Sequence, residues 1–115
     1  MPVPSMVIQA TFQQLAPERQ LEIIYHGAAL RLSELNKRYF LAQSKVRAYA
    51  EQYQTTLTML DAQGLPDDAS FEMHEDYIMW HHWASVADAT QAAIEQLRPL
   101  VEQGLPIGML PHERY

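Results

Sequence analysis

The stretch Gln63-Gly64-Leu65-Pro66 decides the fold, because it separates two long segments that are almost free of helix breakers. No proline lies between Pro17 and this stretch, and only Pro99 lies between it and Gly104. Glycine readily adopts the left-handed backbone that ends a helix, and the proline after it prevents the helix from resuming. A turn this short makes its flanking helices antiparallel neighbours. The sequence therefore predicts an all-α fold with a long antiparallel helical hairpin.

The same motif recurs as Gln103-Gly104-Leu105-Pro106. Each copy fits a Schellman cap, in which the glycine is left-handed and the residue after it contacts the last helical turn. This geometry predicts contacts of Leu65 with Leu60 and of Leu105 with Leu100. We expect both long helices to end at these motifs.

The chain has 115 residues, which suits a single helical domain over 1–115. Leu15-Ala16-Pro17-Glu18 suits a helix start, because proline is tolerated at the first helical position and an acidic residue favours the first turn. Upstream, Thr11-Phe12-Gln13-Gln14 fits a capping box that opens a short helical turn. Helix two is expected to begin near Asp67 or Asp68. The expected parts are an N-terminal arm (1–16), helix one (17–63), helix two (67–103) and a C-terminal tail (104–115).

The first long segment carries a heptad seam from Leu21 to Leu60, in which apolar positions are spaced by three and four residues. Such a seam specifies a helix that packs along one face against other helices. Its weakest part is Thr55-Thr56-Leu57-Thr58, because threonines are poor helix formers and good caps. A break near Gln54 and Thr55 is therefore a specific alternative to one continuous helix.

The second long segment has an inward face that includes Trp80, Trp83, Ala87 and Ile94. A hairpin buries only one stripe of each helix, so apolar residues outside the two seams are left for a partner. The simplest partner is a second copy, which would make a homodimeric four-helix bundle. The residues left outside the seams are Leu30, Phe40, Leu41, Ile78 and Met79.

Composition excludes several classes of function. There is no cysteine, so disulfides, thiolate nucleophiles and cysteine metal sites are absent. Eight Lys and Arg against fourteen Asp and Glu give a net charge of −6, which disfavours direct binding of nucleic acid. The acidity suits a basic protein partner, or serves solubility alone. No stretch has the roughly 20 apolar residues of a membrane span, and no signal peptide is visible, so we expect a cytoplasmic protein.

The histidines His74, His81 and His82 lie near several acidic residues but have the wrong spacing for a metal site. Ligands on one helix must stand three or four residues apart, whereas His74 and His81 are two turns, roughly 10 Å, apart. No haem attachment motif accompanies His26, His81 and His82. The serines lie in no glycine-flanked elbow, and no glycine-rich phosphate loop is present. We therefore expect no metal, no cofactor and no enzymatic activity.

Aromatic and acidic residues gather around the start of helix two. Helical spacing explains the aromatic side chains as core, while tryptophan, tyrosine and methionine are also the residues that anchor interfaces. Acidic residues favour a helix start, and their surplus here suits a basic partner. The predicted partner-binding residues are Tyr49, Tyr53, Glu72, Glu75, Asp76, Tyr77, Met79, Trp80 and Trp83.

A tyrosine-rich helix end, a threonine cap, an Asp-Asp turn and an acidic helix start before a tryptophan follow one another in Lys45–Thr56, Leu65–Asp68 and Glu75–Trp80. This order resembles small acidic helical antitoxin-like proteins of bacterial toxin–antitoxin operons, over about residues 35–95. The chain differs at Gln54, where the pattern has glycine, and at Met79, where it has glutamate. The resemblance implies a role in neutralising a partner and carries over no functional residue.

Three functions remain open at this point. The first is a non-enzymatic protein–protein interaction module, antitoxin-like and homodimeric. The second is a metal- or ligand-binding helical bundle that uses the region of His74, His81 and His82. The third is a structural subunit that assembles with copies of itself.

Overall fold

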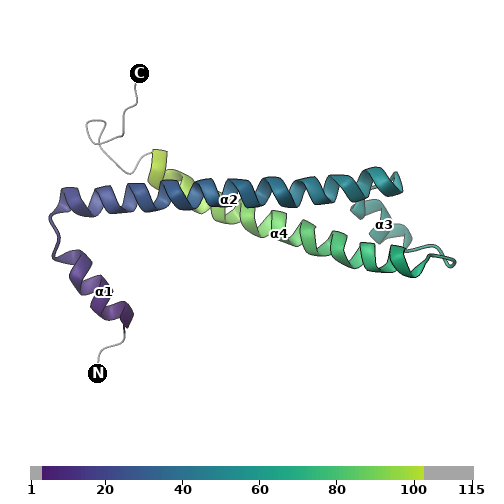
Figure 1. The fold of residues 1–115 in the computed structure, drawn as a ribbon, viewed down its shortest axis with the longest axis horizontal. Coiled ribbons are helices and arrows are strands. Elements are labelled where there is room, and N and C mark those ends of the chain that lie inside the picture. Colours follow the sequence, from purple (N-terminus) through teal and green to yellow (C-terminus); the bar gives the residue numbers. More distant parts are fainter. Residues whose placement is uncertain (1–3, 103–115) are drawn as a thin grey trace, which may run out of the picture. The chain divides into compact units, whose positions relative to one another are not determined.

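The computed structural model describes residues 4–102, and these form four helices and no strand (Figure 1). They are α1 (Pro4–Gln13), α2 (Pro17–Tyr53), α3 (Leu57–Gln63) and α4 (Phe71–Glu102). The predicted all-α class is therefore confirmed. None of these four helices is long and apolar enough to cross a membrane.

The described residues divide into two compact units, and α2 and α4 each contribute residues to both. One unit comprises residues 4–33 and 95–102 of the described chain. The other is Glu34–Ile94 and contains the end of α2, all of α3 and most of α4. We call this second part the hairpin unit.

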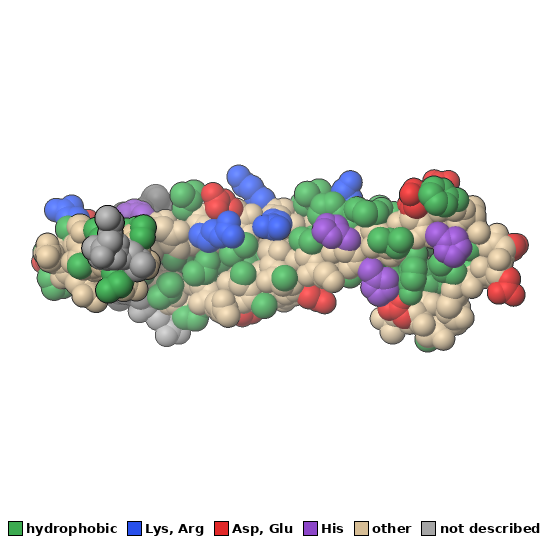
Figure 2. Space-filling view, turned by 90° about the horizontal axis from the view of Figure 1, so that it is seen from below, with side chains coloured by type: hydrophobic (Ala, Val, Ile, Leu, Met, Phe, Trp, Pro, Cys, Tyr) green, Lys and Arg blue, Asp and Glu red, His purple; other side chains and the backbone are tan. Residues whose placement is uncertain are grey.

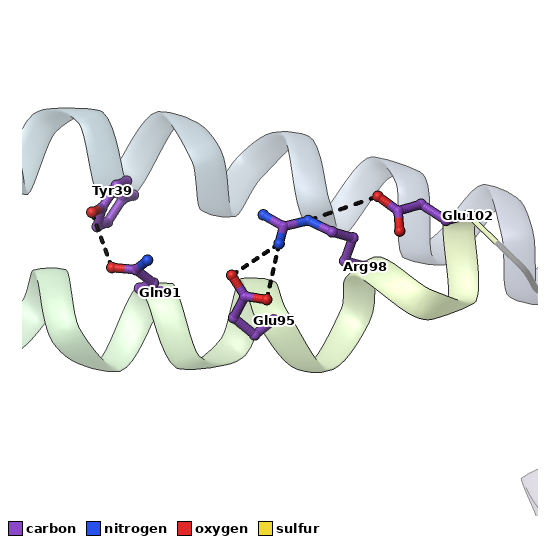
Figure 3. Close-up of polar contacts among 5 residues, drawn as sticks. All are labelled: Tyr39, Gln91, Glu95, Arg98 and Glu102. Carbon is purple, nitrogen blue, oxygen red and sulfur yellow. Dashed lines mark hydrogen bonds and ion pairs between the residues drawn. The ribbon is translucent and has the colours of Figure 1, made fainter.

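The hairpin unit is an antiparallel pair of helices. The Tyr39 hydroxyl of α2 donates a hydrogen bond to Gln91 Oε1 of α4 at 3.0 Å (Figure 3). The Tyr53 hydroxyl at the end of α2 donates to Asp76 near the start of α4. Residue numbers therefore rise along one helix as they fall along the other. The predicted antiparallel hairpin is confirmed in this unit.

Burial follows the predicted seams closely. Every seam residue from Leu21 to Leu60 is at least half-buried, apart from Thr56. Leu35, Ala42, Trp80 and Ile94 are among the most buried side chains. The residues predicted to lie outside the seams are all exposed: Leu30 (65%), Phe40 (71%), Leu41 (47%), Ile78 (66%) and Met79 (41%).

Helix one is not continuous over 17–63 as its predicted bounds had it, because the alternative break near Gln54 and Thr55 occurs, and this break contains the Schellman geometry. Helix α2 ends at Tyr53, Gln54 has a left-handed φ of 52°, and the Thr55 N–H donates to Ala50 O at 3.2 Å. That bond spans five residues, as the Schellman motif requires. Thr56 then caps α3, because its hydroxyl oxygen accepts the Met59 N–H at 3.1 Å.

The end of α3 differs from the predicted cap. Gly64 has a positive φ of 78°, as expected, but its ψ of 164° lies outside the left-handed helical region and inside one that is essentially restricted to glycine. The pair Leu65-Pro66 follows directly, and a proline disfavours the helical conformation at the residue before it. The single closing bond runs from Gly64 N–H to Leu60 O at 2.7 Å. The second copy of the motif, at 103–106, lies outside the described residues, as does the predicted tail at 104–115.

Helix two does not start at Asp67 or Asp68, so that prediction is wrong. These two residues form a turn in which the Ala69 N–H donates to Pro66 O at 3.1 Å. The helix begins at Phe71 because Ser70 supplies the cap. Its hydroxyl accepts the Met73 N–H at 3.0 Å.

The N-terminal arm contains a helix where a capping box was expected. Thr11 lies in the last turn of α1 rather than at a helix start, and its carbonyl accepts the Gln14 N–H at 3.2 Å. Pro4 at the first helical position and the absence of a breaker before Gln13 account for α1. The predicted start of α2 at Pro17 is confirmed.

The last two described turns of α4 carry a separate polar cluster within the helix. The Arg98 guanidinium donates to both carboxylate oxygens of Glu95 at 2.9 Å and lies 3.9 Å from Glu102 (Figure 3). All three side chains are exposed, so these pairs stabilise the helix only weakly.

Candidate functional site

Trp80 lies at the centre of the hairpin unit with 1% of its surface exposed. The Tyr49 ring stacks on it at 5.8 Å between centroids and the Tyr53 ring at 6.2 Å. Its indole Nε1–H has no hydrogen-bond partner among the described residues. Of the predicted partner-binding residues, Trp80 is therefore part of the core and is not presented to a partner.

Tyr53 and Asp76 tie the end of α2 to the start of α4. The Tyr53 hydroxyl donates to Asp76 Oδ2 at 2.5 Å, and the Gln52 amide approaches the same oxygen at 3.5 Å. The hydrogen bond to Asp76, followed by burial and the nearby negative charge, raises the pKa of Tyr53 to about 12. Both residues were predicted to bind a partner, and the structure places them in a bond that stabilises the hairpin.

This bond predicts a loss of stability at alkaline pH. Tyr53 ionises near pH 10 in the unfolded chain and near pH 12 in the folded protein. A raised folded pKa stabilises the fold fully below pH 10, and this contribution disappears as the pH rises to 12. We expect the urea midpoint of the wild type to fall more steeply over this range than that of Tyr53→Phe. The control Tyr39→Phe removes a hydroxyl that bonds an amide rather than a carboxylate, and it should keep the steep fall.

A cluster that the sequence did not predict joins α3 to α4. Asp61 of α3 accepts a hydrogen bond from the Tyr77 hydroxyl, and its Oδ1 lies 2.7 Å from His81 Nε2. The Tyr77 and His81 rings meet edge to face at 4.9 Å. The Tyr77 hydrogen bond, followed by that of His81, lowers the pKa of Asp61, while the same bond to Asp61 raises the pKa of Tyr77.

The contacts of Asp61 with Tyr77 and His81, which we call the Asp61 clamp, hold the short helix α3 against α4. Tyr77 and His81 are four residues apart and so share one face of α4, which a reading of spacing alone could have noted. The break at Gln54 is what brings Asp61 opposite them. His81 and Asp61 are each more than two-fifths exposed, so water screens the contact.

The structure does not bring together the three predicted histidines. His81 contacts Asp61, whereas His82 lies edge to face with Trp83 at 5.2 Å and His74 is exposed. His26 lies in the other unit, against Tyr25. Among the residues that the structure describes, no group of three or more histidine, aspartate or glutamate side chains is placed to hold a metal ion.

Trp83 lies partly at the surface beneath a cation. It is half-buried, and Lys45 Nζ lies 5.9 Å from its ring centroid, within the range of a cation–π contact. Met79, one turn earlier in α4, is 41% exposed. Trp83 and Met79 therefore remain available to a partner, unlike Trp80.

The outward face of α4 exposes large apolar side chains next to acidic ones. Phe71 is 77% exposed and Ile78 66% exposed, and Glu75 and His82 lie on the same face. We call Phe71, Glu75, Ile78 and His82 the outer stripe. Figure 2 shows hydrophobic, acidic and histidine side chains gathered at the end of the molecule that carries α3 and the start of α4.

Two of the predicted acidic residues are exposed in or beside the outer stripe. Glu75 belongs to it and Glu72 lies one turn earlier on the helix, and both are exposed. Neither pairs with a basic side chain among residues 4–102. An apolar stripe with unpaired carboxylates is the arrangement that a basic, partly apolar protein surface would complement.

Comparison of the chain with protein-family models, with curated proteins and with solved structures gave no significant match.

Proposed function

We propose that the protein is a non-enzymatic protein–protein interaction module that binds a basic partner through the outer stripe of α4. The observation that carries this proposal is the exposure of Phe71 and Ile78, seven residues apart on one helix face. Burial of such side chains contributes about 1.5–3 kcal/mol each. Two of them supply the apolar centre that a specific interface needs.

Charge supports the same partner chemistry. The chain carries a net charge of −6, and Glu72 and Glu75 lie beside the two apolar side chains. Carboxylates at the rim of an interface accelerate encounter with a positively charged partner and select against an acidic one. Binding should therefore weaken as ionic strength rises.

An antitoxin-like role is the specific form of this proposal. The order of segments in Lys45–Trp80 resembles proteins of bacterial toxin–antitoxin operons, and an acidic helical surface suits the neutralisation of a basic partner. Such a role places the protein in the cytoplasm. The product of a neighbouring gene is then the first partner to test.

Co-expression with that gene product, followed by size-exclusion chromatography and titration calorimetry, tests the proposal. We expect a complex with wild type that Phe71→Ser/Ile78→Ser weakens at least tenfold. The matched control is Phe40→Ser, because Phe40 is 71% exposed but lies on α2. Its complex should keep the wild-type affinity.

The opposite results would count against the proposal. Equal affinities for the wild type and the double variant would exclude the outer stripe as the binding surface. A wild-type chain that forms dimers alone, and loses them in the double variant, would assign the stripe to a second copy. The protein would then be a self-assembling subunit.

A further inference from the structure

A shallow groove of about 340 Å³ lies between α2 and α4 in the hairpin unit. The groove is distinct from the outer stripe, because its lining includes none of the stripe residues. Each helix contributes three lining residues, which are Gln43, Val46 and Arg47 from α2 and Ala84, Ala87 and Asp88 from α4.

Helix α3 occupies the adjoining stretch of the same side of α4. Asp61 of α3 contacts Tyr77 and His81, and the groove residues Ala84 and Asp88 follow these by seven residues each. A separation of seven residues returns a side chain to the same face of a helix. Helix α3 therefore packs on this side of α4 through Asp61, and the groove leaves the next stretch of α4 uncovered.

The groove combines a small apolar floor with opposite charges on its two walls. Ala84 and Ala87 are half-buried and leave room for larger side chains above them. Arg47 stands exposed on the α2 wall and Asp88 on the α4 wall, and neither forms an ion pair with another described residue. The complement of this surface is a helix with large apolar residues, an acidic residue on one edge and a basic residue on the other.

We infer that this groove binds one amphipathic helix of a partner protein, with a carboxylate facing Arg47 and a basic side chain facing Asp88. The chain's own short helices lack this pattern. Pro4–Gln13 contains no charged residue, and Leu57–Gln63 contains only Asp61. This argues against α1 or α3 of a second copy as the occupant, and self-association is tested below.

Three synthetic helical peptides with one leucine stripe test the charge pattern. One carries a glutamate edge and a lysine edge, one carries glutamate on both edges and one carries lysine on both. We expect wild type to bind the mixed peptide about threefold to tenfold more tightly than the others at low salt. Arg47→Glu makes both walls acidic and should shift the preference to the lysine peptide. Asp88→Lys should shift it to the glutamate peptide.

Two further variants separate the groove from other surfaces. Ala84→Phe fills the floor and should weaken all three peptides, with circular dichroism as the check that the helices remain folded. Phe71→Ser/Ile78→Ser should bind the mixed peptide as wild type does, so failure of the outer stripe and failure of the groove are distinguishable. The groove assignment is overturned if the charge variants keep the wild-type preference or no peptide saturates. Self-association that Arg47→Glu abolishes would also overturn it, since a second copy would then fill the groove.

Discussion

Replacing Trp80 with alanine is expected to lower the free energy of unfolding by about 3–5 kcal/mol. Trp80 is 1% exposed and stacks with both the Tyr49 and the Tyr53 ring, so its removal leaves a cavity and ends both stacking contacts. Domains of this kind are stable by only about 5–15 kcal/mol, so the variant should sit close to the unfolding threshold. Urea denaturation followed by circular dichroism measures the loss.

Two matched variants show whether the cost comes from packing. Trp80→Phe keeps an aromatic ring that can contact the two tyrosines and removes the unpaired indole N–H, so its loss of stability should be clearly smaller than that of Trp80→Ala. Trp83→Ala removes the same side chain from a half-buried position and should cost about 1–2 kcal/mol. Equal losses for Trp80→Ala and Trp83→Ala would refute the central place of Trp80 in the core.

Gly64→Ala is expected to lower the free energy of unfolding by about 1–3 kcal/mol. The backbone at Gly64 has φ 78° and ψ 164°, a conformation that residues with a β-carbon rarely adopt. An added methyl group would meet no atom within 4 Å, so the cost arises from the backbone conformation and not from a clash. Thermal and urea denaturation both report it.

The same substitution at Gly27 provides the control and should have the opposite sign. Gly27 lies inside α2, and a β-carbon there also meets no atom within 4 Å. Alanine favours a helix interior over glycine by about 0.5–1 kcal/mol, so Gly27→Ala should stabilise the protein. A stabilising Gly64→Ala would show that the turn after α3 does not require glycine.

The elements that were predictable from the sequence depend on local patterns. The seam from Leu21 to Leu60 predicted which face of α2 is buried, because heptad spacing determines the face of a helix whatever covers it. Pro17 predicted the start of α2, and the threonines after Gln54 predicted its break. Each of these signals acts over a few residues and needs no knowledge of the rest of the chain.

Competition between neighbouring caps explains the errors at helix ends. Asp67, Asp68 and Ser70 are all good capping residues, and the turn closed by Ala69 and Pro66 leaves the cap to Ser70. The Schellman cap, with its hydrogen bond from Thr55 N–H to Ala50 O, formed at Gln54 and not at the predicted Gly64. At Gly64, a ψ of 164° takes the place of the left-handed helical value that the predicted cap requires.

The candidate site was less predictable, because it depends on how segments meet. Periodicity put Trp80 and Trp83 on one inward face, yet the structure buries the first completely and the second only in part. The clamp of Asp61 with Tyr77 and His81 exists only because α3 folds against α4. The positions of Arg47 and Asp88 on the two walls of one groove likewise depend on the relative placement of two helices.

The clamp at Asp61 has a consequence for the way the protein opens. Helix α3 has seven residues and a single buried side chain, Leu60, and the contact of its Asp61 with His81 of α4 is screened by water. Such a segment forms a separate cooperative unit with a low free energy of opening, well below that of the whole domain. Its amides should exchange with solvent much sooner than those beside Ala42 and Trp80. Native fluctuations of this one segment would expose Leu60 and leave the paired long helices intact.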